Sequence, residues 1–431
     1  MTQTQNHAPS YYAATVNDFT EYPSLQGDIS VDVCIVGGGF SGIATALTLA
    51  ERGLSVALLE ANRIGWGASG RNGGQILAGW SGESALVKQA GEDASKFLWR
   101  TRYRGNDIAE ERIEKYQIQC DYAKGAITAA VNSAQMAMLQ QEHDDCAANG
   151  YTQEMHIAGA SEIRDYVGTE AYVGGLIDTR GGHLHPLNLC LGEARAAHGL
   201  GAQIFEQCPV TEIKHGETPY VITEHGKVTA RFVVLAGNAY HKLERKKLHG
   251  YMLPTETYVI ATEQLNADLA TEILPKNSAV CDANIVLDYY RLSADKRLIF
   301  GGGCNYLNVS NMDPRKELLP RLHKLFPQLR DIGIAFSWSG VMGIPLNRVP
   351  MIGRLTDNSF YVQGYSGHGV NCSHISGEII ADAIQLRDAD IKLFEKVSHF
   401  KIPAADYIGN PMLALGMLYY RMKDRLGISP A

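Results

Sequence analysis

Several signals are missing from the 431-residue chain, and each absence excludes a class of protein. The eight cysteines, at positions 34, 120, 146, 190, 208, 281, 304 and 372, contain no CxxC pair. This scatter implies no disulfide framework and predicts reduced thiols in a cytoplasmic protein. No segment reaches the roughly 18 continuous apolar residues of a membrane span. Residues 1–10 are polar, so no secretory signal is visible.

A surplus of basic charge is also missing. The chain has 39 Lys and Arg against 46 Asp and Glu, a net charge of −7, so it lacks the basic face that nucleic-acid binding requires. Apolar residues make up 45% and charged residues 20%, which is typical of globular proteins and not of disordered ones. The length exceeds one ordinary core and predicts two domains.

A strand–helix–strand unit is predicted near the start of the chain. Residues 31–36 form a short apolar run of the buried-strand type. Residues 41–52 have apolar side chains on one helical face, and Gly53 is placed to end that helix. Residues 55–59 form a second apolar strand that ends at Glu60. The three elements together have the order of a parallel-sheet unit.

The glycine cluster between the first strand and the helix, Gly37 to Gly42, satisfies G-x-G-x-x-G. In this context Gly37 permits a tight turn, Gly39 lets backbone N–H groups approach a pyrophosphate, and Gly42 lets the helix pack closely on the sheet. The helix N-terminus adds partial positive charge toward the phosphates. Glu60 is expected to accept hydrogen bonds from ribose hydroxyls. The alternative interpretation is a plain glycine turn before a helix.

The glycine motif alone does not distinguish NAD from FAD. Residues 61–75 after Glu60 are rich in Gly and include Ser, Asn and Gln, which offers exposed backbone donors and lets a planar ligand lie close to the chain. An ordinary nicotinamide dehydrogenase is expected to continue into another helix here. The segment therefore favours FAD, and a flexible surface loop is the alternative.

Further elements are predicted along the rest of the chain. They comprise a long amphipathic helix over 84–118, a strand over 122–131, helices over 133–148 and 186–199, a buried strand over 231–237, and sheet strands over 251–262 and 284–303. The late glycine-rich turn, residues 364–369, precedes another helix. Residues 412–420 are apolar and adjoin a basic end. They predict a helix that closes the cofactor domain or lies near the active-site entrance, with membrane-surface docking as the alternative.

Three motifs carry a family resemblance: the GGGFSG turn with its flanking strands, the ASGRNGGQ loop at residues 68–75, and the GYSGHGV turn at residues 364–370. Together they resemble the D-amino-acid oxidase family of FAD-dependent oxidoreductases, which includes sarcosine oxidase and glycine oxidase. The resemblance implies an α/β, two-domain fold. A Rossmann-like FAD-binding domain would comprise residues 1–85, 155–240 and 335–431. A substrate domain with an antiparallel sheet would comprise residues 86–154 and 241–334.

The motifs and the resemblance together predict which residues contact FAD. Val210 is expected in a strand that follows the helix 186–199, where the family contacts adenine through its backbone. The full predicted set is Gly37, Gly39, Phe40, Ser41, Gly42, Glu60, Ala61, Arg63, Gly67, Ala68, Ser69, Asn72, Gly73, Gly74, Gln75, Val210, Ala236, Gly237, Gly367, His368, Gly369, Val370 and Asn371. Residues 338–345 contain no cysteine and residues 69–75 no histidine, so FAD is expected to be non-covalent.

Three residues are candidates for catalysis or substrate recognition. His368 suits proton transfer or contact with the flavin edge, and a packing role is the alternative. Tyr290 is expected on a strand that faces the substrate, or is an ordinary sheet aromatic. Glu256 is a candidate for a distal ammonium or amide, or an exposed strand carboxylate. No metal site is expected, because neither His183 with His185 nor the histidines near Cys372 have recognised ligand spacing.

The resemblance implies oxidation of an amine. Hydride moves from the carbon that bears the amine to the flavin, and the imine is hydrolysed to an aldehyde and ammonia. The amine must be neutral, so the pocket is expected to favour its deprotonation. The implied substrate is gamma-glutamylputrescine or a related N-acylated polyamine, with oxygen as the acceptor and H2O2 as product. Two alternatives stay open: an amino-acid or N-methyl-amine dehydrogenase with another acceptor, and a flavoprotein whose FAD is structural and whose task is partner binding.

Overall fold

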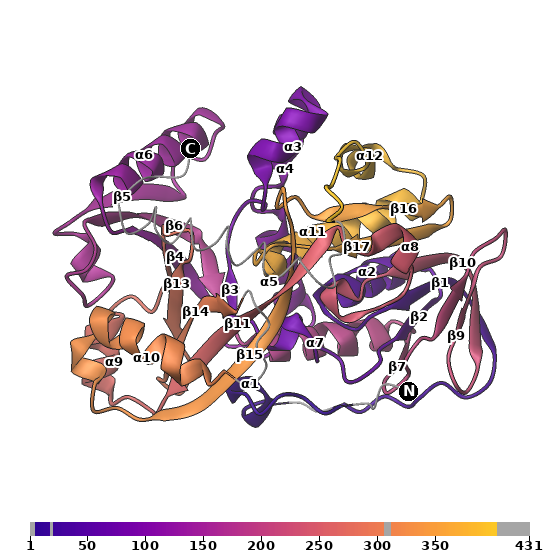
Figure 1. Cartoon of the computed structure of the whole chain (residues 1–431), viewed down its shortest axis with the longest axis horizontal. Helices are drawn as coiled ribbons and strands as arrows, with labels where there is room; N and C mark the ends of the chain where they lie inside the picture. Colours follow the sequence, from indigo (N-terminus) through magenta and orange to yellow (C-terminus); the bar gives the residue numbers. More distant parts are fainter. Residues whose placement is uncertain (1–4, 18–19, 306–311, 403–431) are drawn as a thin grey trace.

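Two β-sheets organise the computed structural model, which describes residues 5–17, 20–305 and 312–402. The first sheet has eight strands in the order β16-β17-β10-β1-β2-β7, with β9 paired to β10 and β8 paired to β9. The second has nine strands in the order β15-β11-β14-β13-β12-β4-β6-β3, with β5 beside β6. The sheets lie in opposite halves of the molecule in Figure 1, and the predicted mixed α/β class is confirmed.

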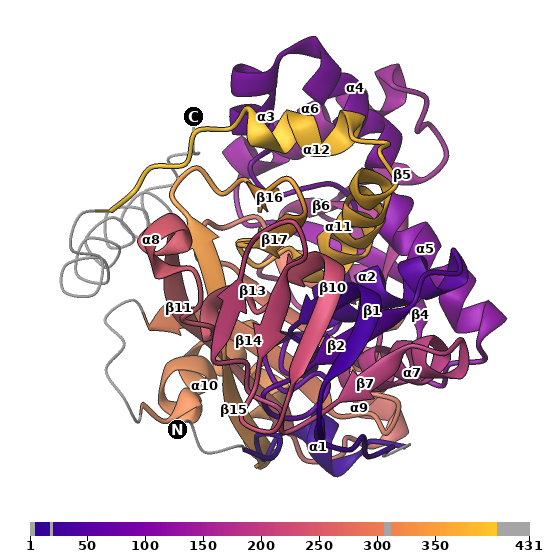
Figure 2. The same ribbon diagram turned by 90° about the vertical axis from the view of Figure 1, so that its right-hand side faces the viewer.

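The first sheet is largely parallel and contains the predicted strand–helix–strand unit. Its strands are β1 (Ile29–Val36), β2 (Val56–Leu59), β7 (Gln203–Phe205), β8 (Glu212–Lys214), β9 (Tyr220–Ile222), β10 (Lys227–Leu235), β16 (Met351–Thr356) and β17 (Ser359–Gln363). Strand β1 pairs in parallel with β2 on one side and β10 on the other, and Figure 2 shows the three side by side. Parallel strands buried on both faces explain the continuous apolar run of β1.

Two helices pack beside this sheet, α2 (Phe40–Glu51) and α7 (Pro186–Gly199), and α11 (Gly369–Ile384) packs on α2. Helix α2 is buried along almost its whole length, because α7 and α11 both pack against it. Small side chains permit the close approach, since a Cβ added to Gly377 would lie 2.8 Å from the backbone of Ala44. The motif at the start of α2 is therefore held on a rigid element.

The second sheet is antiparallel except where β12 pairs with β4. Its strands are β3 (Gln75–Ile76), β4 (Ala123–Ala130), β5 (Met155–Gly159), β6 (Gly174–His183), β11 (Met252–Thr262), β12 (Ala279–Asp282), β13 (Asp288–Leu292), β14 (Leu298–Asn305) and β15 (Ile334–Pro345). The predictions of strands near 122–131, 251–262 and 284–303 are confirmed. Strands β3, β5, β6 and β15 pair here although the predicted FAD domain contains them, and the division into domains stays a prediction.

One helix prediction is wrong. Residues 84–118 form three helices, α3 (Glu83–Ala90), α4 (Glu92–Thr101) and α5 (Arg104–Lys115), and not one. Gly91 separates the first two at a φ of +78°, which a continuing α-helix does not permit. The predicted helix over 133–148 is α6 (Ser133–Ala148), begun by a side-chain cap from Asn132.

The remaining short elements connect the two halves or cover their edges. They are α1 (Tyr11–Ala14), α8 (Arg245–Leu248), α9 (Ala267–Ile273), α10 (Pro314–Leu325), α12 (Ala389–Glu395) and the 3₁₀ turns η1 (Ala68–Gly70), η2 (Ile163–Asp165), η3 (Asn238–Tyr240) and η4 (Pro327–Leu329). The largest apolar cluster includes Ile35 and Leu47 of the first half together with Ile299 and Trp338 of the second sheet. The largest apolar cluster therefore joins the two halves.

Within the described ranges, no helix has the length and apolar character needed to cross a membrane. The apolar segment at 412–420, predicted to form a helix, lies outside the described residues.

Candidate active site

The glycine motif lies at the carboxyl end of β1, where the chain turns into α2. Gly37 has a φ of +116°, and a Cβ there would lie 2.7 Å from the carbonyl oxygen of Ala236. A Cβ on Gly42 would overlap the carbonyl oxygen of Gly37. Both positions therefore require glycine, one for backbone conformation and the other for close packing of helix on turn.

The N-terminus of α2 presents backbone donors at this turn. Gly39 is the N-cap residue and supplies no side-chain cap, so the first N–H groups of the helix depend on outside partners. The N–H of Phe40 donates to Oγ of Ser69 at 2.9 Å, and the Ser41 hydroxyl lies 2.7 Å from that of Tyr365. A helix start with donors and no acidic residue in its first turn fits a phosphate group.

Glu60 follows β2 and closes the turn from the other side. Its carboxylate accepts from the N–H of Gly38 at 2.7 Å and from that of Asn62 at 2.8 Å. Burial raises the pKa of Glu60, while these two donors act to lower it. Each carboxylate oxygen keeps a second acceptor position. The contact of Glu60 with a ribose stays a prediction.

Asn72 holds the early loop in shape. Its amide nitrogen donates to the carbonyls of Ala68 and Ser69 at 3.1 and 2.9 Å, and its amide oxygen accepts from the N–H of Gly74 at 2.8 Å. Because these bonds use both the nitrogen and the oxygen of the amide, the Asn72 side chain stabilises the conformation of the loop.

Strands of the second sheet anchor the end of the same loop. Arg291 Nε donates to the carbonyl of Gly73 at 2.8 Å. Gln75 donates its amide to the carbonyls of Val280 and Tyr290 at 2.9 and 3.3 Å. The loop that follows the dinucleotide unit is therefore fixed between both halves of the molecule.

Three predicted cofactor residues lie beyond β2. The Arg63 guanidinium pairs with Glu206 at 2.8 Å and with Glu21 at 3.3 Å, so its charge is already balanced by carboxylates. Ala61 is exposed at the bend after β2. Val210 is half-buried in the loop between β7 and β8, so the expectation that it lies in a strand is wrong.

Ala236 and Gly237 leave β10 next to the glycine motif. The N–H of Ala236 donates to the Val36 carbonyl at 2.8 Å, and Gly237 begins the 3₁₀ turn Asn238–Tyr240. A Cβ on Gly67 would lie 3.0 Å from the ring of Tyr240 in that turn. The ends of β1 and β10 and the early loop therefore meet at one place.

The late glycine-rich turn joins this place from the far end of the chain. Gly364 and Gly367 have φ of +80° and +93°. The N–H of Ser366 donates to the Gly343 carbonyl at 3.1 Å, and that of Gly364 to the amide oxygen of Asn238 at 3.1 Å. These bonds hold the turn against β15 and η3.

Helix α11 begins at Gly369, and its N-cap residue His368 provides no side-chain cap. Val370 and Asn371 in the first turn are buried. Asn371 donates its amide to the Gly79 carbonyl at 2.9 Å. The first N–H groups of α11 are donors that a ligand with negative charge would satisfy.

His368 is tied to the backbone. Its Nε2 lies 3.0 Å from the carbonyl oxygen of Ala78. Burial lowers the pKa of His368, so the ring is neutral near pH 7. A carbonyl only accepts, and Nε2 therefore carries the proton. This geometry favours the packing alternative, in which the ring holds residues 77–79 against the late turn.

Tyr290 does not face the early loop. Its side chain is fully buried, its hydroxyl lies 2.9 Å from that of Tyr172, and its ring stacks on Phe300. Tyr289 on the opposite face of β13 takes the expected position, since a Cβ on Gly73 would overlap its ring. Successive strand residues point to opposite faces, and no local pattern indicates which of the two tyrosines faces the loop.

Glu256 lies on β11 opposite Val341 of β15. Its carboxylate accepts from the Tyr258 hydroxyl at 3.4 Å. The Val341 N–H donates to the Tyr240 hydroxyl at 3.0 Å. Arg71 of the early loop lies over the Trp66 ring, which packs against Tyr240, and sequence reasoning missed it. An arginine among glycines and small polar residues is the signal that would have found it.

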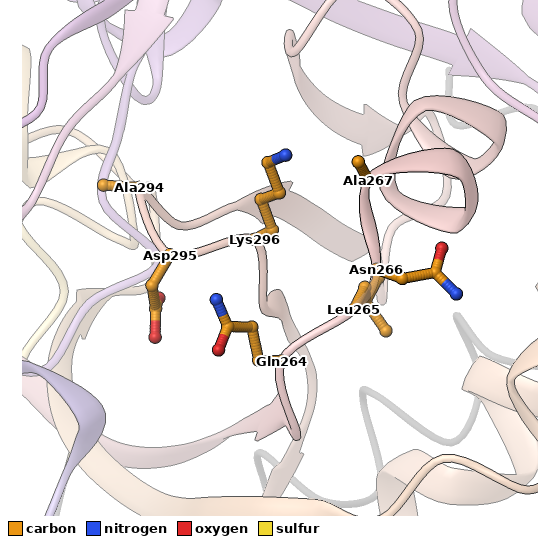
Figure 3. A pocket seen from close by; sticks show the side chains of 7 residues that line it. All are labelled: Gln264, Leu265, Asn266, Ala267, Ala294, Asp295 and Lys296. Carbon is orange, nitrogen blue, oxygen red and sulfur yellow. The ribbon is translucent and has the colours of Figure 1, made fainter.

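A separate surface cavity of about 470 Å³ lies away from the glycine motif. The loop after β11, residues 264–267, and the turn between β13 and β14, residues 294–296, line it (Figure 3). The described residues contain no group of three or more His, Cys, Asp or Glu side chains arranged for a metal ion.

The sequence pattern of the family described as "FAD dependent oxidoreductase" (DAO) matches residues 32–383. The chain is 41% identical over 425 residues to the gamma-glutamylputrescine oxidoreductase of Escherichia coli. The alignment covers 98% of this chain and 99% of the relative. It is 38% identical to the probable oxidoreductase OrdL of Haemophilus influenzae over 98% of both chains.

Solved structures show the same fold. Glycine oxidase from Geobacillus kaustophilus superposes with a TM-score of 0.68 at 22% identity, over 83% of this chain and 95% of that one. L-proline dehydrogenase from P. horikoshii superposes with a TM-score of 0.71 at 19% identity, over 86% and 96%. The donors at the start of α2 and the glycine cradle fit the pyrophosphate of FAD, the cofactor of this family. The chain belongs to the DAO family of FAD-dependent oxidoreductases.

Proposed function

We propose that this protein oxidises the terminal amine of gamma-glutamylputrescine, or of a related N-acylated polyamine, to an imine. Water then hydrolyses the imine to an aldehyde and ammonia. When bound, FAD would supply the acceptor for the hydride of the amine-bearing carbon, with oxygen as the final electron acceptor and H2O2 as the product. The observation that carries the proposal is the 41% identity to gamma-glutamylputrescine oxidoreductase over 98% of the chain.

The residues around the glycine motif are assigned to FAD. The N–H groups at the start of α2 would bind the pyrophosphate, with Ser69 beside them. Glu60 would accept from the ribose of the adenosine. The first-turn N–H groups of α11 would donate to the electron-rich edge of the flavin. FAD is proposed to be non-covalent, because residues 338–345 contain no cysteine and residues 69–75 no histidine.

The substrate is assigned to the face of the second sheet that meets the early loop. Tyr289, in place of Tyr290, lies against Gly73 and would exclude water from the reacting carbon. Glu256 would accept from a distal ammonium group. The reacting amine must lose its proton before hydride leaves, and apolar surroundings favour that loss. His368 would hold the late turn in place through Ala78 and is assigned no proton transfer.

Two competing functions differ in a measurable way. A dehydrogenase would oxidise the amine without forming H2O2, and a flavoprotein with structural FAD would not oxidise amines at all. Steady-state assays in air with gamma-glutamylputrescine test the proposal. It predicts one H2O2, one ammonia and one aldehyde for each amine consumed. Turnover only with an added electron acceptor would instead support the dehydrogenase.

A further inference from the structure

Arg71 holds a positive charge that no acidic side chain balances within the described part of the chain. Its Nε donates to the Trp66 carbonyl at 2.8 Å, and one terminal nitrogen lies 3.5 Å from the Ser339 carbonyl. The guanidinium lies 4.5 Å from the centre of the Trp66 ring. Burial lowers the pKa of Arg71. A guanidinium has five N–H donors, so most remain available for an anion.

Arg63 in the same loop shows the contrast. Its guanidinium pairs with Glu206 at 2.8 Å and with Glu21 at 3.3 Å. Arginine is favoured at partly buried positions because its planar fork binds a carboxylate through two parallel hydrogen bonds. Arg71 has the fork and lacks the carboxylate, which points to an anionic ligand.

The loop holds Arg71 firmly against β15. The indole N–H of Trp338 donates to the Arg71 carbonyl at 2.9 Å. A Cβ on Gly340 would lie 3.2 Å from the Arg71 Cβ, so glycine at that position lets the arginine lie close to the strand. The side chain is therefore preorganised, which lowers the entropy cost of binding a ligand.

Glu256 also lies near Tyr240, because it pairs across the sheet with Val341, whose N–H donates to the Tyr240 hydroxyl at 3.0 Å. Burial raises the pKa of Tyr240, the charge of Arg71 acts to lower it, and the charge of Glu256 acts to raise it. The Tyr240 ring also packs edge-to-face on Trp66, with 5.4 Å between ring centres. A cationic and an anionic side chain thus lie near one tyrosine, an arrangement that complements a ligand with both charges on one carbon.

We propose that Arg71 binds the carboxylate at the distal end of the gamma-glutamyl group and that Glu256 accepts from the ammonium on the same carbon. This inference rests on the proposed function. The phosphates of FAD are assigned to the start of α2, where Ser69 lies, whereas the Arg71 side chain extends to β15. Arg71 thereby makes the enzyme prefer gamma-glutamyl amines over amines acylated with an uncharged group.

The test compares two substrates on the FAD-loaded enzyme, gamma-glutamylputrescine and N-acetylputrescine, which lacks the distal carboxylate. Arg71→Met is expected to lower kcat/KM at least about 30-fold for the first substrate, mainly through KM, and less than about 3-fold for the second. Arg71→Lys is expected to recover part of the loss, because it keeps the charge without the fork. Arg100→Met, an exposed arginine paired with Asp390, is the matched control and leaves the substrate ratio unchanged.

A binding measurement separates this inference from the proposed function. Gamma-glutamyl-n-butylamine keeps the distal carboxylate and lacks the reacting amine, so calorimetry follows its binding without turnover. The Kd is expected to rise about 30-fold in Arg71→Met. If the wild type bound this probe through Arg71 yet oxidised no polyamine, the proposed function alone would fail. Equal losses on both substrates, or weaker FAD retention with an unchanged substrate ratio, would overturn the role of Arg71 and assign it to the cofactor.

Discussion

Replacing Arg291 by methionine tests whether the second sheet holds the early loop in the conformation that binds FAD. Arg291 is 2% exposed and forms no ion pair among the described residues. It donates to the Gly73 carbonyl at 2.8 Å, to the Tyr12 hydroxyl at 3.1 Å and to the Leu292 carbonyl at 3.1 Å. The side chain thus ties β13 to the early loop and to α1.

The expected cost follows from these bonds. A hydrogen bond from a charged donor contributes about 1.5–3 kcal/mol, so losing those to Gly73 and Tyr12 costs about 3–6 kcal/mol. Removing a buried charge that has no acidic partner offsets part of this cost. We expect a net loss of about 3 kcal/mol in the free energy of unfolding. If about half of this free energy is lost from the FAD-binding conformation of the early loop, the Kd for FAD would rise roughly tenfold.

The assay combines thermal unfolding of the apoprotein with fluorescence titration of FAD. Tyr12→Phe is the matched variant, because it removes one of the two partners and leaves the bond to Gly73. It is expected to lose about 1.5–3 kcal/mol in the free energy of unfolding and to retain the wild-type Kd for FAD. If Arg291→Met bound FAD as tightly as the wild type does, the anchoring role of Arg291 would be refuted.

Three further outcomes are expected. Tyr290→Phe leaves the Tyr172 hydroxyl without its buried partner. The free energy of unfolding is expected to fall by about 1–3 kcal/mol, while kcat/KM stays unchanged. A large loss of kcat/KM would show that Tyr290 acts in the active site. Burial lowers the pKa of His183 to about 3, so below about pH 6.5 the unfolded chain binds the proton that the folded one excludes. Chemical unfolding is therefore expected to show the wild type losing about 2 kcal/mol relative to His183→Gln between pH 7 and pH 5; parallel curves would contradict this. Acid precipitation is expected to release the yellow flavin into solution, and colour that stays with the precipitate would mean a covalent link.

The first sheet was largely predictable because its signals are local. The apolar run of β1, the glycines after it and the periodic face of α2 lie in one stretch of chain, and each agrees with the others. The division of residues 84–118 into three helices was missed, because the amphipathic pattern continues across Gly91. Backbone conformation at Gly91 decides the first of the two breaks, and the second lies between Thr101 and Arg104.

The site was less predictable, because its side chains meet through contacts between distant segments. Side chains alternate between the two faces of β13, and Tyr289, not Tyr290, is on the face toward Gly73. A shift of the strand by one residue would exchange the two tyrosines. The partner of Arg63 is Glu206, 143 residues away, and no local pattern indicates such a pairing. Arg71 differs from Arg63 because the fold brings Ser339 and Tyr240 close to its side chain and brings no carboxylate.

The most direct test of the central claim is anaerobic mixing of the FAD-loaded protein with gamma-glutamylputrescine. The flavin absorbance is followed as one equivalent of amine is added. We expect complete loss of the yellow colour at one equivalent and its return when oxygen is admitted, with H2O2 formed. No bleaching by gamma-glutamylputrescine, with rapid bleaching by a different amine, would contradict the assigned substrate. No bleaching by any amine would contradict amine oxidation itself.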